Sequence, residues 1–178
     1  MRQADEDRFR EFARNQAGAL RRSAYLLCGD WHFAEDLVQT TLLKLHGAWP
    51  RVTRRHQPVS YARKTLLNCW LDERRRVWRR SEQRDGTLPD SADPSADPVA
   101  SHERAGLRAE LLAALATLPP RQRAVLVLRF FESLSVVETA EALGCSDGTV
   151  KSQTFKGLAA MKAAFDGESV DARLKEFR

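Results

Sequence analysis

The chain has 178 residues and a formal net charge of +5, and 43% of its residues are apolar. This length allows one medium domain or two small ones, and the apolar content excludes a chain that is disordered throughout. No uninterrupted apolar run approaches the roughly 20 residues of a membrane-spanning helix, and the charged N-terminus is unlike a signal peptide. We therefore expect a cytoplasmic protein.

The residue types that carry catalysis or bind metals are few and poorly spaced for either role. Cys28, Cys69 and Cys145 are far apart and form no CxxC pair, which favours buried or incidental thiols over a metal site or a disulfide. The four histidines lack metal-ligand spacing, and no phosphate-binding glycine loop or nucleophile elbow occurs. The sequence predicts no cofactor, no metal and no enzymatic activity.

Charge is distributed unevenly along the chain. Residues 1–80 carry a net charge of +8, residues 81–103 carry −5, and residues 104–178 carry +2. The middle segment also holds three prolines and few apolar side chains larger than alanine. Because such a segment cannot offset its ordering entropy by burial, we expect it to be an extended linker. The prediction is two polyanion-facing domains, 1–80 and 104–165, with a tail of unassigned function at 166–178.

In the first domain, apolar residues recur at helical spacing in three segments. Helices are therefore expected at about 5–27, 31–49 and 59–80, and Pro50 is expected to end the second of them. The exposed face of the second helix is acidic and polar within a basic domain, which suits a protein partner better than DNA. A merely solvated face is the alternative. The residues of this face are Glu35, Asp36, Gln39 and Thr40.

The third predicted helix combines aromatic and cationic residues. Tyr61, Trp70 and Trp78 are interleaved with Arg63, Lys64 and the arginines of residues 74–80. Aromatic faces together with cations are what unstacked, single-stranded bases require. Core packing is the alternative role for Tyr61 and Trp70.

After the linker the sequence predicts four more helices, so the fold class is all-α with two small helical domains. The helices are expected at about 104–118, 120–132, 136–143 and 146–165. Ser135 and Glu138 have the spacing of a capping box. Gly144 suits a left-handed turn, and Val150 can fill the core between the last two helices. This layout is that of a helix-turn-helix, whose second helix enters the DNA major groove.

The start of the last predicted helix presents a set of polar, cationic and aromatic side chains. They are Ser146, Thr149, Lys151, Ser152, Phe155 and Lys156. Lysine can meet phosphates or purine edges, serine can form short hydrogen bonds, and phenylalanine can contact a thymine methyl. The alternative is that Phe155 is a core residue and the lysines only solvate the helix. With the whole motif present, the prediction is DNA binding.

Three stretches, in this order, resemble the sigma-70 family, and within it the extracytoplasmic-function sigma factors of the sigma-E type common in actinobacteria. AYLLCGDWHFAEDLVQTTLLKLHGAW (24–49) looks like sigma region 2.1–2.2. SYARKTLLNCWLDERRR (60–76) looks like region 2.4. LATLPPRQRAVLVLRFFESLSVVETAEALGCSDGTVKSQ (115–153) looks like region 4. Motifs of this length, separated by a Pro/Asp-rich linker, are far more specific than a helix-turn-helix alone.

The resemblance implies a sigma factor that binds core RNA polymerase and promoter DNA and directs transcription initiation. The beta-prime clamp helices are expected to dock on Glu35, Asp36, Leu37, Gln39 and Thr40. The −10 element is expected to meet the 51–58 loop together with Tyr61, Arg63, Asn68, Asp72 and Arg75. The outward set of the last helix is expected to read the −35 element, and another surface of that domain to hold the beta flap. The linker is expected to thread toward the active-site channel.

Some features depart from the family pattern. Gln153 and Lys156 stand where arginine is frequent, and His46 stands where an aromatic residue is usual. Since lysine cannot fork to guanine as arginine does, we expect a loosened or shifted base preference. The large C-terminal domain of some family members is lacking, so control is expected from a separate anti-sigma factor or from expression.

Two other functions fit parts of the pattern. One is an independent helix-turn-helix regulator, which would act as a dimer on a palindromic site. The other is an interaction protein with a degenerate sigma fold, such as an anti-sigma antagonist.

Overall fold

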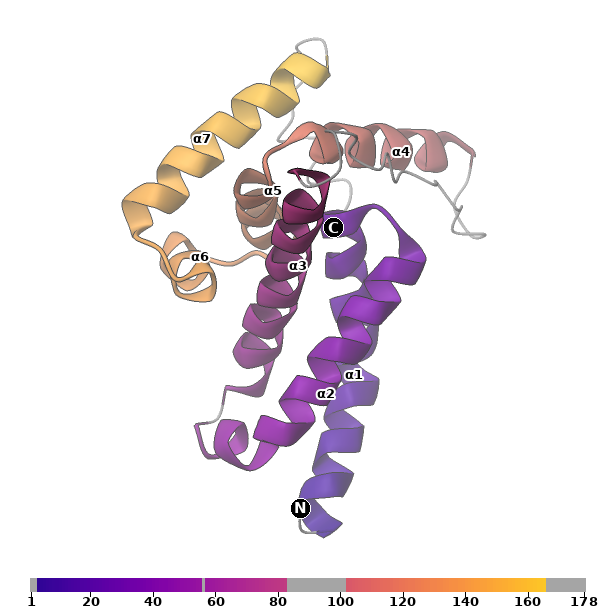
Figure 1. Cartoon of the computed structure of the whole chain (residues 1–178), viewed down its shortest axis with the longest axis vertical. Helices are drawn as coiled ribbons and strands as arrows, with labels where there is room; N and C mark the ends of the chain where they lie inside the picture. Colours follow the sequence, from indigo (N-terminus) through magenta and orange to yellow (C-terminus); the bar gives the residue numbers. More distant parts are fainter. Residues whose placement is uncertain (1–2, 56, 83–101, 166–178) are drawn as a thin grey trace. The chain divides into compact units, whose positions relative to one another are not determined.

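A computed structural model describes residues 3–55, 57–82 and 102–165, and all of its regular elements are helical, as predicted (Figure 1). The elements are α1 (Gln3–Cys28), α2 (Trp31–Arg54), α3 (Pro58–Glu82), α4 (His102–Thr117), α5 (Pro120–Leu126), the π-helical turn η1 (Val127–Phe131), α6 (Val136–Leu143) and α7 (Asp147–Ala164). None of these helices is long and apolar enough to cross a membrane.

The chain divides into two compact units, one built around α1–α3 and the other around α4–α7. The first comprises residues up to 90 except Leu26–Asp30, which are grouped with residues 91–178 in the second. The predicted tail 166–178 and nearly all of the predicted linker lie outside the described residues.

Helices α2 and α3 supply most of the core of the first unit. Leu37, Thr41 and Leu45 of α2 and Leu66 and Trp70 of α3 are all at most 4% exposed. Their spacing of four or eight residues places each set on one face of its helix, so the two faces can be buried together. Trp70 therefore takes the core role that was the alternative to base stacking.

The prediction that Pro50 ends α2 is wrong, because the helix continues to Arg54 with the proline inside it. A proline in a helix interior costs about 3 kcal/mol through its missing donor and its steric clash. Trp49 and Val52 on either side are only 3% and 4% exposed. Burying two such side chains contributes roughly 3–6 kcal/mol, which offsets that cost. The connection to α3 is consequently shorter than the predicted 51–58 loop.

Helix α1 packs against the C-terminal half of α2 through aromatic side chains. Phe9 and Phe12 lie with their ring centroids 5.3 and 5.2 Å from that of Trp49. Phe9 also meets the ring of His46 edge-on at 4.9 Å, and His46 Nε2 lies 3.1 Å from a carboxylate oxygen of Glu6. These contacts fix the first turns of α1 to the C-terminal half of α2.

The second unit has a main core formed by α4, α5 and α7. Leu111 and Leu115 cluster there with Leu126 and Met161, each at most 1% exposed. Helix α7 approaches α5 closely at Gly157, where an added Cβ would lie 3.1 Å from Leu126. A smaller cluster, described below, joins α6 to α7.

The predicted helix at 120–132 is divided into two parts. α5 ends at Leu126, and η1 follows with the Glu132 N–H bonded to the Val127 carbonyl, five residues back, at 3.1 Å. A π-turn holds one residue more than an α-turn, which changes the direction of the following side chains. Phe130 and Phe131 both pack against the main core from this turn.

Candidate nucleic-acid interface

The helix-turn-helix begins with the predicted capping box at α6. The Glu138 backbone N–H donates to Ser135 Oγ at 3.1 Å, and the Ser135 N–H donates to Glu138 Oε2 at 2.8 Å. These two bonds satisfy N–H groups that would otherwise lack partners at the helix start. The helix therefore starts at Val136, as the sequence predicted.

The turn between α6 and α7 has the geometry that its sequence predicts. Gly144 adopts φ 63° and ψ 44°, a left-handed conformation that glycine enters without steric cost. The backbone N–H of the following residue, Cys145, donates a hydrogen bond to the Ala140 carbonyl oxygen at 3.0 Å. Ala140 and Val150 are 5% and 0% exposed and cluster with Val125. The small alanine and the buried valine thus hold α7 against α6 and α5.

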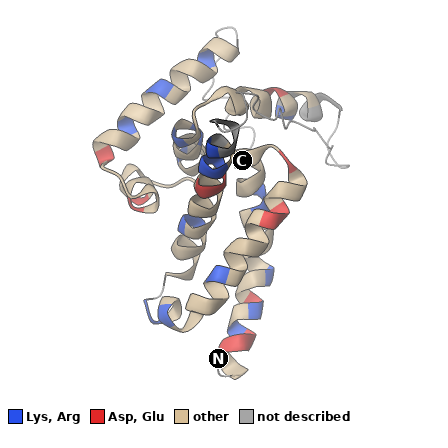
Figure 2. Cartoon of the chain, viewed as in Figure 1, with Lys and Arg blue, Asp and Glu red and all other residues tan. Residues whose placement is uncertain are grey.

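The outward side of α7 carries the side chains that the sequence selected for DNA. Lys151, Ser152, Phe155 and Lys156 are all exposed, and Phe155 is 75% exposed. Val150 and Gly157 lie on the opposite, buried side. This excludes the alternative that Phe155 is a core residue. Figure 2 marks the basic residues in blue at intervals along the α7 ribbon.

Ser146 and Thr149 have a structural task at the start of α7. The Thr149 N–H donates to Ser146 Oγ at 3.2 Å, which makes Ser146 the N-cap of α7. Their hydroxyl oxygens also lie 2.9 Å apart. Both hydroxyls thus stiffen the end of the helix that enters the major groove in this motif.

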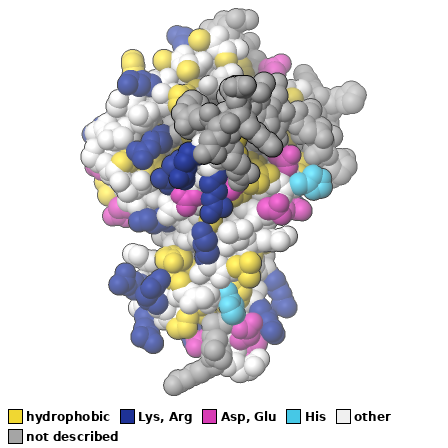
Figure 3. Space-filling view, in the orientation of Figure 1, with side chains coloured by type: hydrophobic (Ala, Val, Ile, Leu, Met, Phe, Trp, Pro, Cys, Tyr) yellow, Lys and Arg dark blue, Asp and Glu magenta, His cyan; other side chains and the backbone are white. Residues whose placement is uncertain are grey.

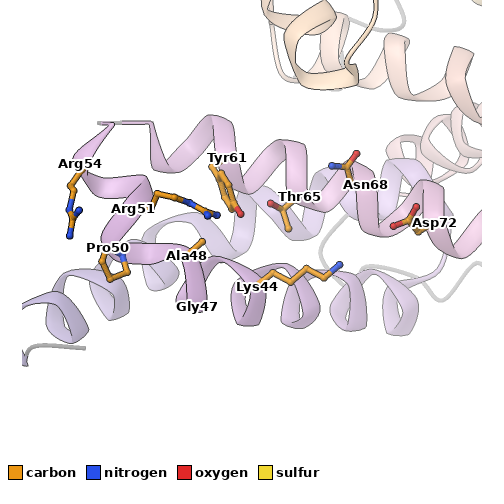
Figure 4. A pocket seen from close by; sticks show the side chains of 10 residues that line it. All are labelled: Lys44, Gly47, Ala48, Pro50, Arg51, Arg54, Tyr61, Thr65, Asn68 and Asp72. Atoms are coloured by element: carbon orange, nitrogen blue, oxygen red, sulfur yellow. The ribbon is translucent and has the colours of Figure 1, made fainter.

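A groove of about 730 Å³ runs between α2 and α3 in the first unit (Figure 4). Its lining residues are Lys44, Gly47, Ala48, Pro50, Arg51, Arg54, Tyr61, Thr65, Asn68 and Asp72. Three cations and one aromatic ring therefore face the same hollow as a hydroxyl, an amide and a carboxylate. Figure 3 shows cationic side chains gathered at the end of this unit where α2 meets α3.

The structure brings together most of the residues predicted to meet the −10 element. Tyr61, Asn68 and Asp72 line the groove because they are seven and four residues apart, close to whole turns of α3. Arg75 pairs with Asp72 at 2.5 Å and so lies beside the groove. Arg63 is not among the lining residues, since it follows Tyr61 by only two positions on the helix.

The sequence did not single out Lys44, Thr65 or the helical placement of Arg51 and Arg54. Lys44 comes from α2, and its Nζ lies 3.3 Å from Cys69 Sγ on α3. Arg51 and Arg54 face the groove because α2 continues past Pro50. The basic residues after Trp49 were the available signal in the sequence. Because they were expected to lie in a loop, the sequence could not predict which way their side chains face.

The predicted docking face of α2 is exposed at four of its five positions. Glu35, Asp36, Gln39 and Thr40 are exposed. Leu37 is 4% exposed, so its side chain lies in the core and not on this surface.

Arg21 of α1 makes two contacts with α2 beside this face. Glu35 pairs with Arg21 of α1 at 3.3 Å, and Arg21 lies 5.4 Å from the ring centroid of Trp31. Leu43, which the sequence did not select, is 75% exposed. It follows Thr40 and Gln39 by three and four residues, so it extends the same face.

Comparison with known proteins accounts for both units. Sigma-70 region 2 matches residues 12–80, and Sigma-70 region 4 matches residues 108–161. The RNA polymerase sigma-E factor of Streptomyces avermitilis is 36% identical over 168 residues, which cover 94% of this chain and 90% of that protein. This chain belongs to the sigma-70 family.

Other relatives agree with membership in the extracytoplasmic-function group of sigma factors. The sigma-E factor of Streptomyces coelicolor is 37% identical over 171 residues, covering 94% of this chain and 92% of the relative. The extracytoplasmic-function sigma factor SigE of Mycolicibacterium smegmatis is 36% identical over 154 residues, covering 83% of this chain and 57% of that protein. The resemblance predicted from the sequence is confirmed.

Two solved structures share the fold of this sigma factor. The sigma factor RpoE of Bartonella quintana, crystallised with the anti-sigma factor NepR, has a TM-score of 0.77 at 23% identity and covers 90% of this chain and 98% of its own. CnrH, in complex with the cytosolic domain of CnrY, has a TM-score of 0.64 at 20% identity and covers 92% and 91%.

Proposed function

We propose that this sigma factor uses three surfaces for three tasks in transcription initiation. A sigma factor binds core RNA polymerase and directs it to promoters. The assignment of the tasks to residues rests on one observation: polar, cationic and aromatic side chains are exposed on the start of α7 and again in the α2–α3 groove. The protein acts by binding and carries out no covalent chemistry.

The start of α7 reads the −35 element. Lys151 and Lys156 meet phosphates or the acceptor edges of purines, and Ser152 donates or accepts a short hydrogen bond. Phe155 has no core role, and a 75% exposed ring next to two lysines suits contact with a thymine methyl. Ser146 and Thr149 support this face through the hydroxyl contact that caps the start of α7. Either hydroxyl can also approach a phosphate.

The α2–α3 groove holds the opened −10 strand. Tyr61 offers a ring on which an unstacked base can lie, and Asn68 offers both a donor and an acceptor for its edge. Lys44, Arg51 and Arg54 provide positive charge for the strand backbone. Unpairing a base costs a few kcal/mol of free energy. Stacking and phosphate contacts in the groove must offset this cost.

The exposed side of α2 binds core polymerase, and its chemistry supports this role. Glu35 and Asp36 are carboxylates in a unit of positive net charge, so they suit a cationic protein surface rather than DNA. Leu43 adds an exposed apolar side chain to the polar residues Gln39 and Thr40. An apolar centre with a polar surround is typical of protein interfaces.

The location and control of the protein follow from these partners. A sigma factor works where RNA polymerase is, which supports the predicted cytoplasmic location. Both solved relatives are complexes, and the partner bound to RpoE in its crystal structure is an anti-sigma factor. This supports the prediction of a separate protein regulator for this chain.

The test uses DNA fragments identified by run-off transcription from genomic DNA with purified core polymerase and this chain. Binding is then measured with and without core polymerase. We expect specific binding only in its presence. An equally strong footprint from the chain alone would instead support an independent regulator acting on a palindrome.

Charge reversal in α7 separates DNA reading from a purely protein-binding role. We expect the double variant Lys151→Glu/Lys156→Glu to abolish promoter binding by the holoenzyme but to leave its affinity for core polymerase unchanged. Lys162→Glu makes the same type of change further along α7, about three turns beyond Lys151, and should have little effect. Undiminished promoter binding by the double variant would contradict DNA reading and favour the interaction protein.

A further inference from the structure

A lysine–thiol contact joins the two helices that form the groove. Lys44 Nζ of α2 donates a hydrogen bond to Cys69 Sγ of α3 at 3.3 Å. Cys69 is only 7% exposed, whereas the lysine side chain is exposed and lines the groove. The contact therefore connects a cation in the groove to a fixed point in the core.

The contact gives the lysine a direction. Figure 4 shows Lys44 extending from α2 along the groove toward Asn68 and Asp72. A free lysine side chain carries about 2 kcal/mol of rotamer entropy, part of which is lost whenever it binds a phosphate. Holding the ammonium at Cys69 beforehand reduces that loss, which is how preorganisation raises affinity.

The chemistry of the thiol matters as much as its position. Sulfur is a weak, uncharged acceptor, so the ammonium keeps its charge and two further N–H donors. A carboxylate at the same place would hold the lysine more tightly but neutralise it. The nearby carboxylate of Asp72 is itself paired with Arg75 at 2.5 Å.

We infer that Lys44 contacts a backbone phosphate of the opened promoter strand and that Cys69 is the positioning residue that aims it. This inference rests on the proposed role of the groove in holding the −10 strand. Cys69 does not touch the nucleic acid itself and acts through Lys44 alone.

The experiment is a double-mutant cycle on the holoenzyme. The probe is a promoter fragment, recovered by run-off transcription, whose −10 region is left unpaired. The variants are Lys44→Gln, Cys69→Val, Cys69→Ser and the Lys44→Gln/Cys69→Val pair. Affinity is measured over a range of salt concentrations, and each variant's thermal unfolding is followed by circular dichroism.

The expected results separate the two residues. Lys44→Gln should weaken binding and make the slope of log affinity against log salt shallower by about 0.7, as for one single-strand phosphate. Cys69→Val should weaken binding roughly threefold, as for one lost hydrogen bond. Cys69→Ser, which keeps an acceptor, should remain close to the natural chain. Adding Cys69→Val to Lys44→Gln should change nothing further.

Several results would overturn the inference. An unchanged salt slope in Lys44→Gln excludes the phosphate contact, as does an equal change in Lys64→Gln, an exposed α3 lysine outside the groove. A Cys69→Val effect that is absent, or that persists without Lys44, excludes positioning. A folding defect would also weaken binding whether or not Lys44 is present. The double-mutant cycle therefore distinguishes a folding defect from a loss of positioning. Failure of the natural chain to bind the fragment with core polymerase would instead reject the proposed function.

Discussion

The close approach of α7 to α5 makes Gly157→Ala an informative perturbation. An alanine Cβ at this position would lie 3.1 Å from both Cγ and Cδ1 of Leu126, where carbon atoms prefer 3.5–4.0 Å. Leu126 is 0% exposed and is surrounded by the main core of the second unit. The leucine therefore has little room to move away, and we expect α7 to shift or the core to be strained.

Two effects of opposite sign decide the size of the change. Overpacking a core costs typically 1–3 kcal/mol, whereas alanine is better than glycine in a helix interior by up to about 1 kcal/mol. Gly106→Ala in α4 is a matched control, because that glycine is exposed and no atom lies within 4 Å of its added Cβ. The helix-propensity gain is common to both variants, so Gly157→Ala should be less stable than Gly106→Ala by about 1–3 kcal/mol.

The assay is urea unfolding of the full chain followed by two signals. Circular dichroism reports helix in both units, whereas the four tryptophans, at positions 31, 49, 70 and 78, report only the first. Gly157→Ala should therefore shift the dichroism curve and leave the fluorescence curve in place. If Gly157→Ala proves as stable as Gly106→Ala, Leu126 can move aside without cost, and the expected overpacking of the core is wrong.

Two further predictions concern titratable groups. The hydrogen bond from His46 lowers the pKa of Glu6 from its usual 4.5, so the stability that Glu6 contributes is present above that value and is lost as pH falls through the lowered pKa. The difference in unfolding free energy between the natural chain and Glu6→Gln should shrink below about pH 4.5, and a constant difference would contradict this assignment. Burial raises the pKa of the Cys28 thiol to about 11. In a Cys69→Ser/Cys145→Ser variant at about pH 8, iodoacetamide should react with it roughly 100-fold more slowly than in concentrated urea, and equal rates would refute that burial.

Local signals in the sequence predicted the helix-turn-helix to within a residue or two. Ser135 with Glu138, Gly144 and Ser146 act on backbone groups within three to five positions of themselves, so their effect hardly depends on the rest of the fold. The outward residues of α7 followed from the same short-range pattern. The family resemblance then supplied the sigma-factor identity, which the comparisons confirm.

The groove and the docking face were less predictable because burial decides them. Pro50 predicts a helix end from local rules, but α2 continues because Trp49 and Val52 are buried. Leu37 directly follows the exposed residues Glu35 and Asp36 and is nevertheless in the core. Leu43 was overlooked because an apolar residue in an amphipathic helix is expected to be buried.

The sequence by itself determined seven helical segments, their division into two units, and the residues that cap and turn the DNA-reading motif. These depend on propensity, spacing and short-range hydrogen bonds, which a linear pattern records. Only the tertiary structure decided which faces of α2 and α3 meet. That packing directs Lys44, Arg51 and Tyr61 into one groove and brings Lys44 to Cys69, 25 positions away in the chain. Such contacts arise from the competition of all apolar side chains for burial, which no single stretch of sequence specifies.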